Sequence, residues 1–166
     1  SPLGGPICSV NSGQLLGHPE FFDDFCNSIV TFEGEEPLHR LLSALKAGDS
    51  LSTVPNLLHL DGREVVQNKE RVELRFEELP GPTFDGLPMH DYLSPYPIIP
   101  VLQSRGCYWG KCTFCTHSFV YGHRYGKQKT HGMVDELEAL MKKYNTKYFT
   151  FSDEAVSPHS LNDVSE

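Results

Sequence analysis

The sequence lacks any long hydrophobic run. A transmembrane helix requires about 18 consecutive apolar residues, and no segment of the chain comes near that length. Its first residues have no initiator Met, basic segment or apolar stretch, so they do not resemble a secretory signal. Basic residues are also scarce, because 14 Lys and Arg stand against 22 Asp and Glu, for a net charge of −8. This balance argues against a generally basic nucleic-acid-binding protein. We therefore expect a soluble, cytoplasmic protein that does not contact a membrane.

A paired set of cysteines is missing as well. The chain has five cysteines, and three of them fall between residues 107 and 115. An odd number with such crowding is a poor disulfide framework and favours a reducing compartment. Cys8 and Cys26 each stand alone beside an apolar segment. We expect these two to be ordinary buried thiols.

The length of 166 residues suits about one domain, or one domain with part of another. Residues 2–6 are typical of the turn that follows a strand, and the sequence ends soon after an apolar run at 148–151. We therefore expect a fragment of a larger protein, which carries the end of one domain and the start of the next.

The first half alternates helical and strand patterns. The expected elements are a helix over 15–25 with Pro19 in its first turn, a strand over 28–32, a leucine-rich helix over 38–48, and a hairpin of 57–60 with 63–67. Asp61-Gly62 between the last two segments is a strong hairpin signal. This α/β pattern predicts a first domain over residues 1–75.

A proline-rich linker is predicted over residues 76–97, because proline removes backbone donors and stiffens the chain. The second predicted domain, 98–166, begins with a strand at 98–102. A long loop, a helix over 133–144 with Thr130 as a candidate cap, and a strand at 148–151 follow. This order is typical of a parallel βαβ unit, in which ligands bind beyond the carboxyl ends of the strands.

Three cysteines with the spacing C-x4-C-x2-C lie in that long loop, at Cys107, Cys112 and Cys115. Thiols at this spacing can converge on one metal centre. They could bind zinc if a histidine supplied a fourth ligand, with candidates at His117, His123 and His131. They could instead bind an iron–sulfur cube with one open iron. The loop from 103 to 131 has no acidic residue and a net charge of +5, which suits an anionic ligand.

The segment from Ser104-Arg-Gly-Cys107 to Cys115 resembles the cluster loop of radical S-adenosylmethionine enzymes, although the first gap has one residue more than the usual C-x3-C. The resemblance implies that the three cysteines hold a 4Fe–4S cluster and that Phe114 lies near the adenine of S-adenosylmethionine. It also implies that Asp153 and Glu154 contact the methionine amino group, although the usual pair of glycines before the acid is absent.

Upstream, the order of segments is similar to that of the cobalamin-binding subgroup of this superfamily. Gly4, Gly5 and the Glu33-Gly-Glu35 turn correspond to segments near the cobalamin tail. The implied fold is α/β: the C-terminal part of a Rossmann-like cobalamin-binding domain, followed by the first βαβ of a partial (β/α) TIM-like barrel.

The implied function is reductive cleavage of S-adenosylmethionine to a 5′-deoxyadenosyl radical, with cobalamin-dependent methyl transfer or rearrangement as the outcome. The resemblance implies an electron donor such as flavodoxin or ferredoxin and a small-molecule or peptide substrate. We expect the chain to be inactive alone, because the substrate pocket would be built from later barrel strands.

A second interpretation belongs to a different class of protein. Cys107, Cys112, Cys115 and His117 would hold zinc and fold a basic loop whose aromatic side chains stack on nucleic acid. The metal content separates the two interpretations, because one predicts iron with sulfide and the other predicts zinc.

Overall fold

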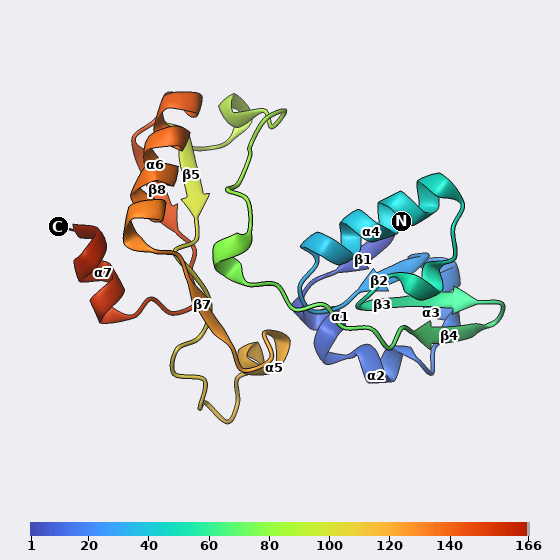
Figure 1. The fold of residues 1–166 in the computed structure, drawn as a ribbon. Coiled ribbons are helices and arrows are strands. Elements are labelled where there is room, and N and C mark those ends of the chain that lie inside the picture. The colour runs from blue at the N-terminus through green and yellow to red at the C-terminus, as the bar shows by residue number, and fades with distance from the viewer. Residues whose placement is uncertain (166) are drawn as a thin grey trace. The chain divides into compact units, whose positions relative to one another are not determined.

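Two compact units make up the protein. The computed structural model describes residues 1–165. One unit consists of residues 1–74 together with 113–122, and the other consists of residues 75–112 together with the chain from 123 onward. Both units contain helices and strands (Figure 1), so the predicted α/β class is confirmed. Glu166, the last residue of the second predicted domain, lies outside the described residues.

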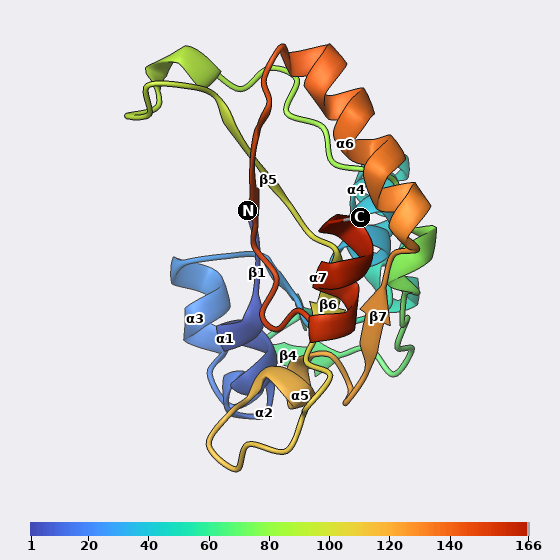
Figure 2. The same cartoon turned by 90° about the vertical axis from the view of Figure 1, so that its left-hand side faces the viewer.

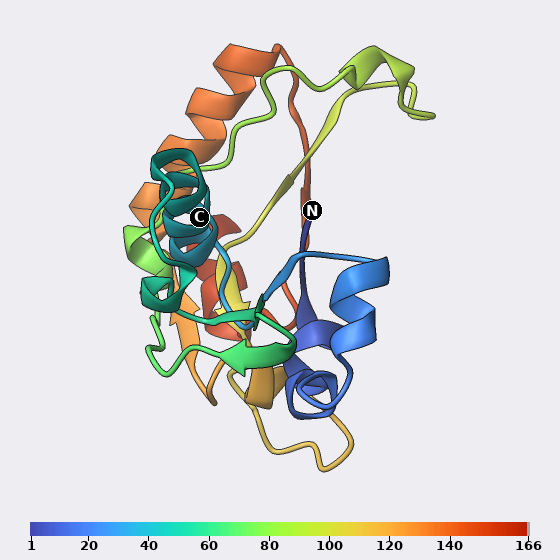
Figure 3. The ribbon, with the colours of Figure 1, turned by 90° about the vertical axis from the view of Figure 1, so that its right-hand side faces the viewer.

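A four-stranded sheet forms the centre of the first unit. Its strands are β1 (Pro2–Gly4), β2 (Ser28–Val30), β3 (Leu57–Asp61) and β4 (Glu64–Gln67), in that spatial order. β1 runs parallel to β2, whereas β3 runs antiparallel to both of its neighbours. The hairpin predicted around Asp61-Gly62 is therefore confirmed, and Figure 3 shows β3 and β4 side by side.

The helices of the first unit differ from the sequence prediction at one place. They are α1 (Pro6–Val10), α2 (Ser12–Leu15), α3 (Pro19–Asp24), α4 (Glu35–Ala47), the short 3-10 helix η1 (Leu51–Thr53) and α5 (His117–Val120). The single helix predicted over 15–25 is wrong, because Pro19 starts a new helix after a non-helical His18. The leucine-rich helix is confirmed as α4, which ends at a left-handed Gly48.

Apolar side chains pack on both faces of this sheet. Leu41 of α4 lies with Val54 and Leu57 in one cluster, whereas Phe22 and Leu58 belong to the other. The predicted leucine stripe of α4 is only partly buried: Leu41 is fully buried, and the remaining leucines of the stripe are exposed, namely Leu38, Leu42 and Leu45.

The second unit contains the predicted βαβ arrangement. Its elements are η2 (Phe76–Glu78), η3 (Met89–Asp91), β5 (Ile98–Val101), β6 (Ser104–Gly106), β7 (Tyr125–Lys127), α6 (Thr130–Tyr144), β8 (Tyr148–Phe151) and α7 (Pro158–Ser165). β5 and β8 pair in parallel, and Figure 1 shows both strands next to α6, whereas Figure 2 shows β5 and α6 after a 90° turn. The prediction of Thr130 as a cap is wrong, because Thr130 is the first helical residue and no side chain caps the helix.

The proline-rich segment packs on α6. The Phe84 ring meets the Tyr144 ring edge-on at 5.7 Å, and the Phe84 amide donates to the Tyr144 hydroxyl at 2.7 Å. Lys143 donates to Asp85 at 2.5 Å. Despite its prolines, this segment is therefore held by specific contacts. Among the described residues, none of the helices has the length and apolar character needed to span a bilayer.

Candidate cofactor site

The cysteine loop begins directly after β6. Cys107 is half-buried, whereas Cys112 and Cys115 are exposed, and all three are free thiols. The division between the two units falls inside this loop, so that Cys107 and Cys112 belong to the second unit and Cys115 to the first. Within the described residues, no three His, Cys, Asp or Glu side chains are gathered in a metal-binding arrangement. The structure therefore presents three free thiols on one loop.

Gly106, which precedes Cys107, permits a close backbone approach. Its φ is +87°, and a Cβ at this position would lie 2.2 Å from the Arg124 carbonyl oxygen. Because glycine has no Cβ and tolerates positive φ, only glycine fits here. β6 and β7 pair at this point, with Gly106 opposite Tyr125. A long loop is predicted over residues 103–131, whereas this pairing shows that part of the segment forms a short hairpin.

Asp153 lies next to the start of the same loop. Its Oδ1 accepts hydrogen bonds from the Ser104 amide at 2.5 Å and the Ser104 hydroxyl at 2.6 Å, and its Oδ2 accepts from the Gln103 amide at 3.1 Å. Glu154 and Phe114 are exposed, Phe114 to 88%. The sequence predicts cofactor contacts for all three residues, and the structure gives Asp153 an additional set of contacts within the protein.

The turns that follow β1 and β2 lie beside one another. Because these strands are parallel, their carboxyl ends meet at one edge, with Gly4 opposite Val30. Gly5 is exposed with a φ of +107°, and a Cβ there would meet nothing within 4 Å. The structure therefore brings the predicted Gly4-Gly5 segment next to the turn that begins at Phe32.

Ser9 and Phe32 organise this edge. The sequence predicts Phe32 as the end of a strand over 28–32, whereas β2 ends at Val30, and no prediction is made for Ser9. The fully buried Ser9 hydroxyl accepts a hydrogen bond from the Phe32 amide at 2.6 Å and donates to the Gly5 carbonyl at 3.3 Å. Phe32 has a φ of +60°, which is uncommon for a residue with a side chain. No local sequence pattern indicates this contact, because the two residues are 23 positions apart.

The Phe32 ring also connects to the segment that carries Cys115. Its centroid lies 5.8 Å from the Phe119 ring of α5, and the Arg71 guanidinium lies 3.8 Å from the same centroid. Val120 of α5 is buried, and α5 packs on α1. The residues immediately after Cys115 are therefore docked beside the two turns.

The buried carboxylate of Glu33 stabilises the second turn, since it accepts a hydrogen bond from the Leu74 amide at 2.8 Å. The Asn56 side chain adds a hydrogen bond to the Glu33 carbonyl at 3.3 Å. Part of the predicted Glu33-Gly-Glu35 segment is therefore held from inside the unit.

The histidines considered for zinc differ in their surroundings. His117 stacks on Tyr121 with ring centroids 5.6 Å apart, and its Nδ1 is buried without a hydrogen-bond partner among the described residues. His123 and His131 are exposed.

Cys8 and Cys26 differ from the loop cysteines. Both pack in the Phe22 cluster, and burial raises the pKa of each thiol. A raised pKa disfavours the thiolate that binds metals. Cys26 is therefore a buried thiol as predicted, and Cys8 is a half-buried one.

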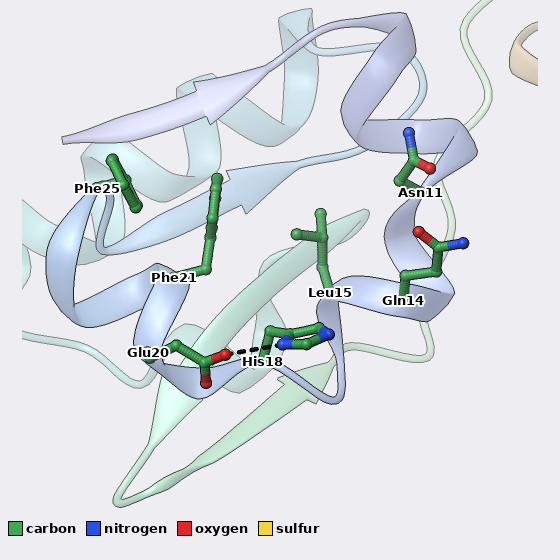
Figure 4. A pocket seen from close by; sticks show the side chains of 7 residues that line it. All are labelled: Asn11, Gln14, Leu15, His18, Glu20, Phe21 and Phe25. Atoms are coloured by element: carbon green, nitrogen blue, oxygen red, sulfur yellow. Dashed lines mark hydrogen bonds and ion pairs between the residues drawn. The ribbon is translucent and has the colours of Figure 1, made fainter.

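A shallow pocket of about 350 Å³ opens on the first unit beside α2 and α3 (Figure 4). His18 Nδ1 lies 2.7 Å from Glu20 Oε1 within it, and this hydrogen bond lowers the pKa of the Glu20 carboxyl. The pocket is lined by Asn11, Gln14, Leu15, His18, Glu20, Phe21 and Phe25. None of the predicted site residues lies in it.

Comparison with known proteins identifies the fold. No family model matches the chain. The uncharacterized methyltransferase PH0819 from Pyrococcus horikoshii is 30% identical over 154 residues, which cover 92% of this chain and 32% of that protein. The radical S-adenosylmethionine methyltransferase TsrM from Kitasatospora setae, solved with tryptophan substrate and a cofactor analogue, matches with a TM-score of 0.64 and 20% identity over 98% of this chain and 32% of TsrM.

The cobalamin-dependent S-adenosylmethionine radical enzyme OxsB, solved with aqua-cobalamin, matches with a TM-score of 0.68 and 22% identity over 98% of this chain and 23% of OxsB. The chain thus spans about a third or less of the length of these proteins. Over nearly its whole length, it has the fold of cobalamin-dependent radical S-adenosylmethionine enzymes, which confirms the resemblance noted in its sequence.

Proposed function

We propose that this chain is part of a cobalamin-dependent radical S-adenosylmethionine enzyme that transfers methyl groups. The observation that carries the proposal is the presence of three free thiols, spaced C-x4-C-x2-C, within a fold that matches such enzymes over 98% of the chain. TsrM is described with cobalamin and a [4Fe–4S] cluster bound, and the relative from Pyrococcus horikoshii is described as a methyltransferase.

The three cysteines suit a 4Fe–4S cluster in type and number. Cys112 and Cys115 are exposed and Cys107 is half-buried, so iron can reach all three sulfurs. Three thiolates leave one iron of the cube open. Cys107, Cys112 and Cys115 would hold such a cluster, and the cluster would supply the electron for reductive cleavage of S-adenosylmethionine.

The remaining loop residues supply charge and contact surface. Net charge from 103 to 131 is +5, which stabilises an anionic cluster and the carboxylate of S-adenosylmethionine. Glu154 presents an exposed carboxylate that can accept hydrogen bonds from the methionine ammonium group. The exposed ring of Phe114 offers a flat apolar face for the adenine.

The edge formed by Gly4, Gly5 and the Phe32 turn is our candidate for contact with the cobalamin tail. The absence of a side chain at Gly5, where a Cβ would meet nothing within 4 Å, lets a ligand approach the backbone closely. Ligands of α/β sheets bind beyond the carboxyl ends of parallel strands, which is where these turns lie. We further propose flavodoxin or ferredoxin as the electron donor and a small molecule or peptide as the substrate.

Anaerobic reconstitution with iron and sulfide tests the proposal. We expect iron and sulfide in equal amounts, together with a reduced-state EPR signal that shifts when S-adenosylmethionine is added. Each of the variants Cys107→Ala, Cys112→Ala and Cys115→Ala should lose this signal. Cys8→Ala is the matched control and should keep it, because Cys8 lies in the first unit's apolar cluster.

Two outcomes would refute the proposal. Stoichiometric zinc without sulfide, lost in His117→Ala, would support the zinc module instead. A cluster that forms equally well in Cys112→Ala and in the unaltered chain would show that the cysteine triad does not hold it.

A further inference from the structure

The Asp153 carboxylate is committed to hydrogen bonds with the start of the cysteine loop. Oδ1 accepts from both the amide and the hydroxyl of Ser104, and Oδ2 accepts from the Gln103 amide. These donors lie 49 and 50 positions earlier in the chain. Hydrogen bonds to an ionised acceptor are shorter and stronger than neutral ones. Asp153 thus joins the segment after β8 to the segment after β5.

The residues held by Asp153 are deeply buried. Ser104 has no exposed surface, and Gln103 is 2% exposed. The Ser152 amide donates to the Val101 carbonyl at 2.9 Å, which extends the β5–β8 pairing up to the Asp153 contact. A buried backbone amide that loses its acceptor cannot turn to water instead, so the Asp153 contacts are costly to break.

Cys107 follows Ser104 by three residues, and the backbone between them is constrained at both ends. Asp153 holds Ser104 at one end, and Gly106 lies against the Arg124 carbonyl at the other. The Gln128 amide donates to the Gln103 carbonyl at 2.9 Å and adds a further constraint. The backbone that leads to Cys107 is therefore held at Ser104 by Asp153 and at Gly106 by the close approach of Arg124.

We infer that Asp153 is a positioning residue for the cysteine loop and not a ligand of the methionine ammonium group. The inference rests on the proposed function. Asp153 acts through Ser104 on the position of Cys107.

The first experiment uses the 166-residue chain without cofactors. N-ethylmaleimide modification of each loop cysteine is followed by peptide mass spectrometry in the unaltered chain and in Asp153→Asn. Asparagine places an NH2 group against a backbone amide, which then loses its hydrogen-bond acceptor. The segment before Cys107 should therefore open more often, and we expect Cys107 to react with N-ethylmaleimide about tenfold faster. Cys112 and Cys115 are exposed already and should change less than about twofold.

A milder variant keeps the test valid if Asp153→Asn unfolds the chain. Ser104→Ala removes only the hydroxyl hydrogen bond and leaves both amide contacts. We expect it to accelerate modification of Cys107 by a smaller factor than Asp153→Asn. Equal acceleration of all three cysteines would indicate general unfolding, and an unchanged Cys107 rate in folded Asp153→Asn would overturn the inference.

The second experiment compares Asp153→Asn with Glu154→Gln after reconstitution. We expect Asp153→Asn to lose iron to a chelator about tenfold faster, while its remaining clusters still give the EPR shift with S-adenosylmethionine. Glu154→Gln should retain iron normally and need more S-adenosylmethionine for the same shift. The reverse assignment of these two effects would overturn the inference.

The two experiments also separate this inference from the proposed function. If the unaltered chain takes up no cluster, the proposed function fails. The N-ethylmaleimide rates still decide whether Asp153 positions Cys107, because they require no cofactor.

Discussion

The Ser9 hydroxyl lies 2.6 Å from the Phe32 amide nitrogen and accepts its hydrogen bond. This contact joins α1 to the turn after β2, where Phe32 adopts a φ of +60°. A non-glycine residue in this region persists only when its surroundings stabilise it. Ser9 supplies part of that stabilisation, and it holds the Phe32 turn next to the Gly4-Gly5 segment.

Replacing Ser9 should therefore destabilise the first unit. Ser9→Ala leaves the Phe32 amide without its acceptor, and we expect a loss of about 1–3 kcal/mol in the free energy of unfolding. Urea denaturation followed by circular dichroism measures it. Ser43→Ala is the control, since Ser43 is exposed within α4 and alanine is the better helix former. An equal loss in both variants would show that the Ser9 hydrogen bond contributes little.

Gly106 provides a sharper test of the β6–β7 hairpin. An alanine Cβ would lie 2.2 Å from the Arg124 carbonyl oxygen at a φ of +87°. We expect Gly106→Ala to cost about 2–4 kcal/mol, because the positive φ and the overlap both oppose it. Gly132→Ala in α6 is the matched control, since nothing lies within 4 Å of its Cβ. That change should stabilise α6 by about 0.5–1 kcal/mol, and the same sign for both variants would contradict the prediction.

The contact between Asp85 and α6 should make stability depend on pH. The hydrogen bond from Lys143, reinforced by that from Tyr144, lowers the pKa of Asp85 below its usual value. Because the folded-state pKa is the lower one, the stabilisation is present above the unfolded-state pKa and is lost as pH falls through the folded-state pKa. Urea midpoints measured from neutral to acidic pH should therefore fall less in Asp85→Asn than in the unaltered chain.

Lys143 is the partner that completes this test. Asp85 raises the pKa of the Lys143 ammonium group, so the same contact weakens as alkaline pH rises through that raised value. Lys143→Met should reduce the acid dependence by less than Asp85→Asn does, because Tyr144 still donates to Asp85, and the double variant should behave like Asp85→Asn alone. Additive effects would mean that the two residues act independently.

Phe119 and Phe114 should respond differently to truncation, although both flank the loop cysteines. The Phe119 ring packs against Phe32 at 5.8 Å, whereas Phe114 is 88% exposed. We expect Phe119→Ala to lower the free energy of unfolding of the first unit by about 1 kcal/mol. Phe114→Ala should leave that stability unchanged and weaken binding of S-adenosylmethionine to the reconstituted cluster. A loss of stability in Phe114→Ala would contradict this division.

Local signals explain which parts of the fold could be predicted. Asp61-Gly62 favours a tight hairpin by itself, and the periodic leucines before Gly48 indicate a helix and its end. The cysteine spacing likewise lies within one loop. Pro19 lies in the first turn of a helix as predicted, but that helix begins at Pro19 and not at residue 15, because His18 is not helical.

The contacts that organise the candidate site depend on residues far apart in the chain. Ser9 and Phe32 are 23 positions apart, and Asp153 and Ser104 are 49 apart. β6 and β7 have only three residues each, too few to show an alternating pattern. The sequence by itself determined the spacing of the three cysteines and the order of the βαβ unit, because both are local. Only the tertiary structure decided which backbone Asp153 holds and which turn Ser9 supports, because such pairings exist only after distant segments have packed together.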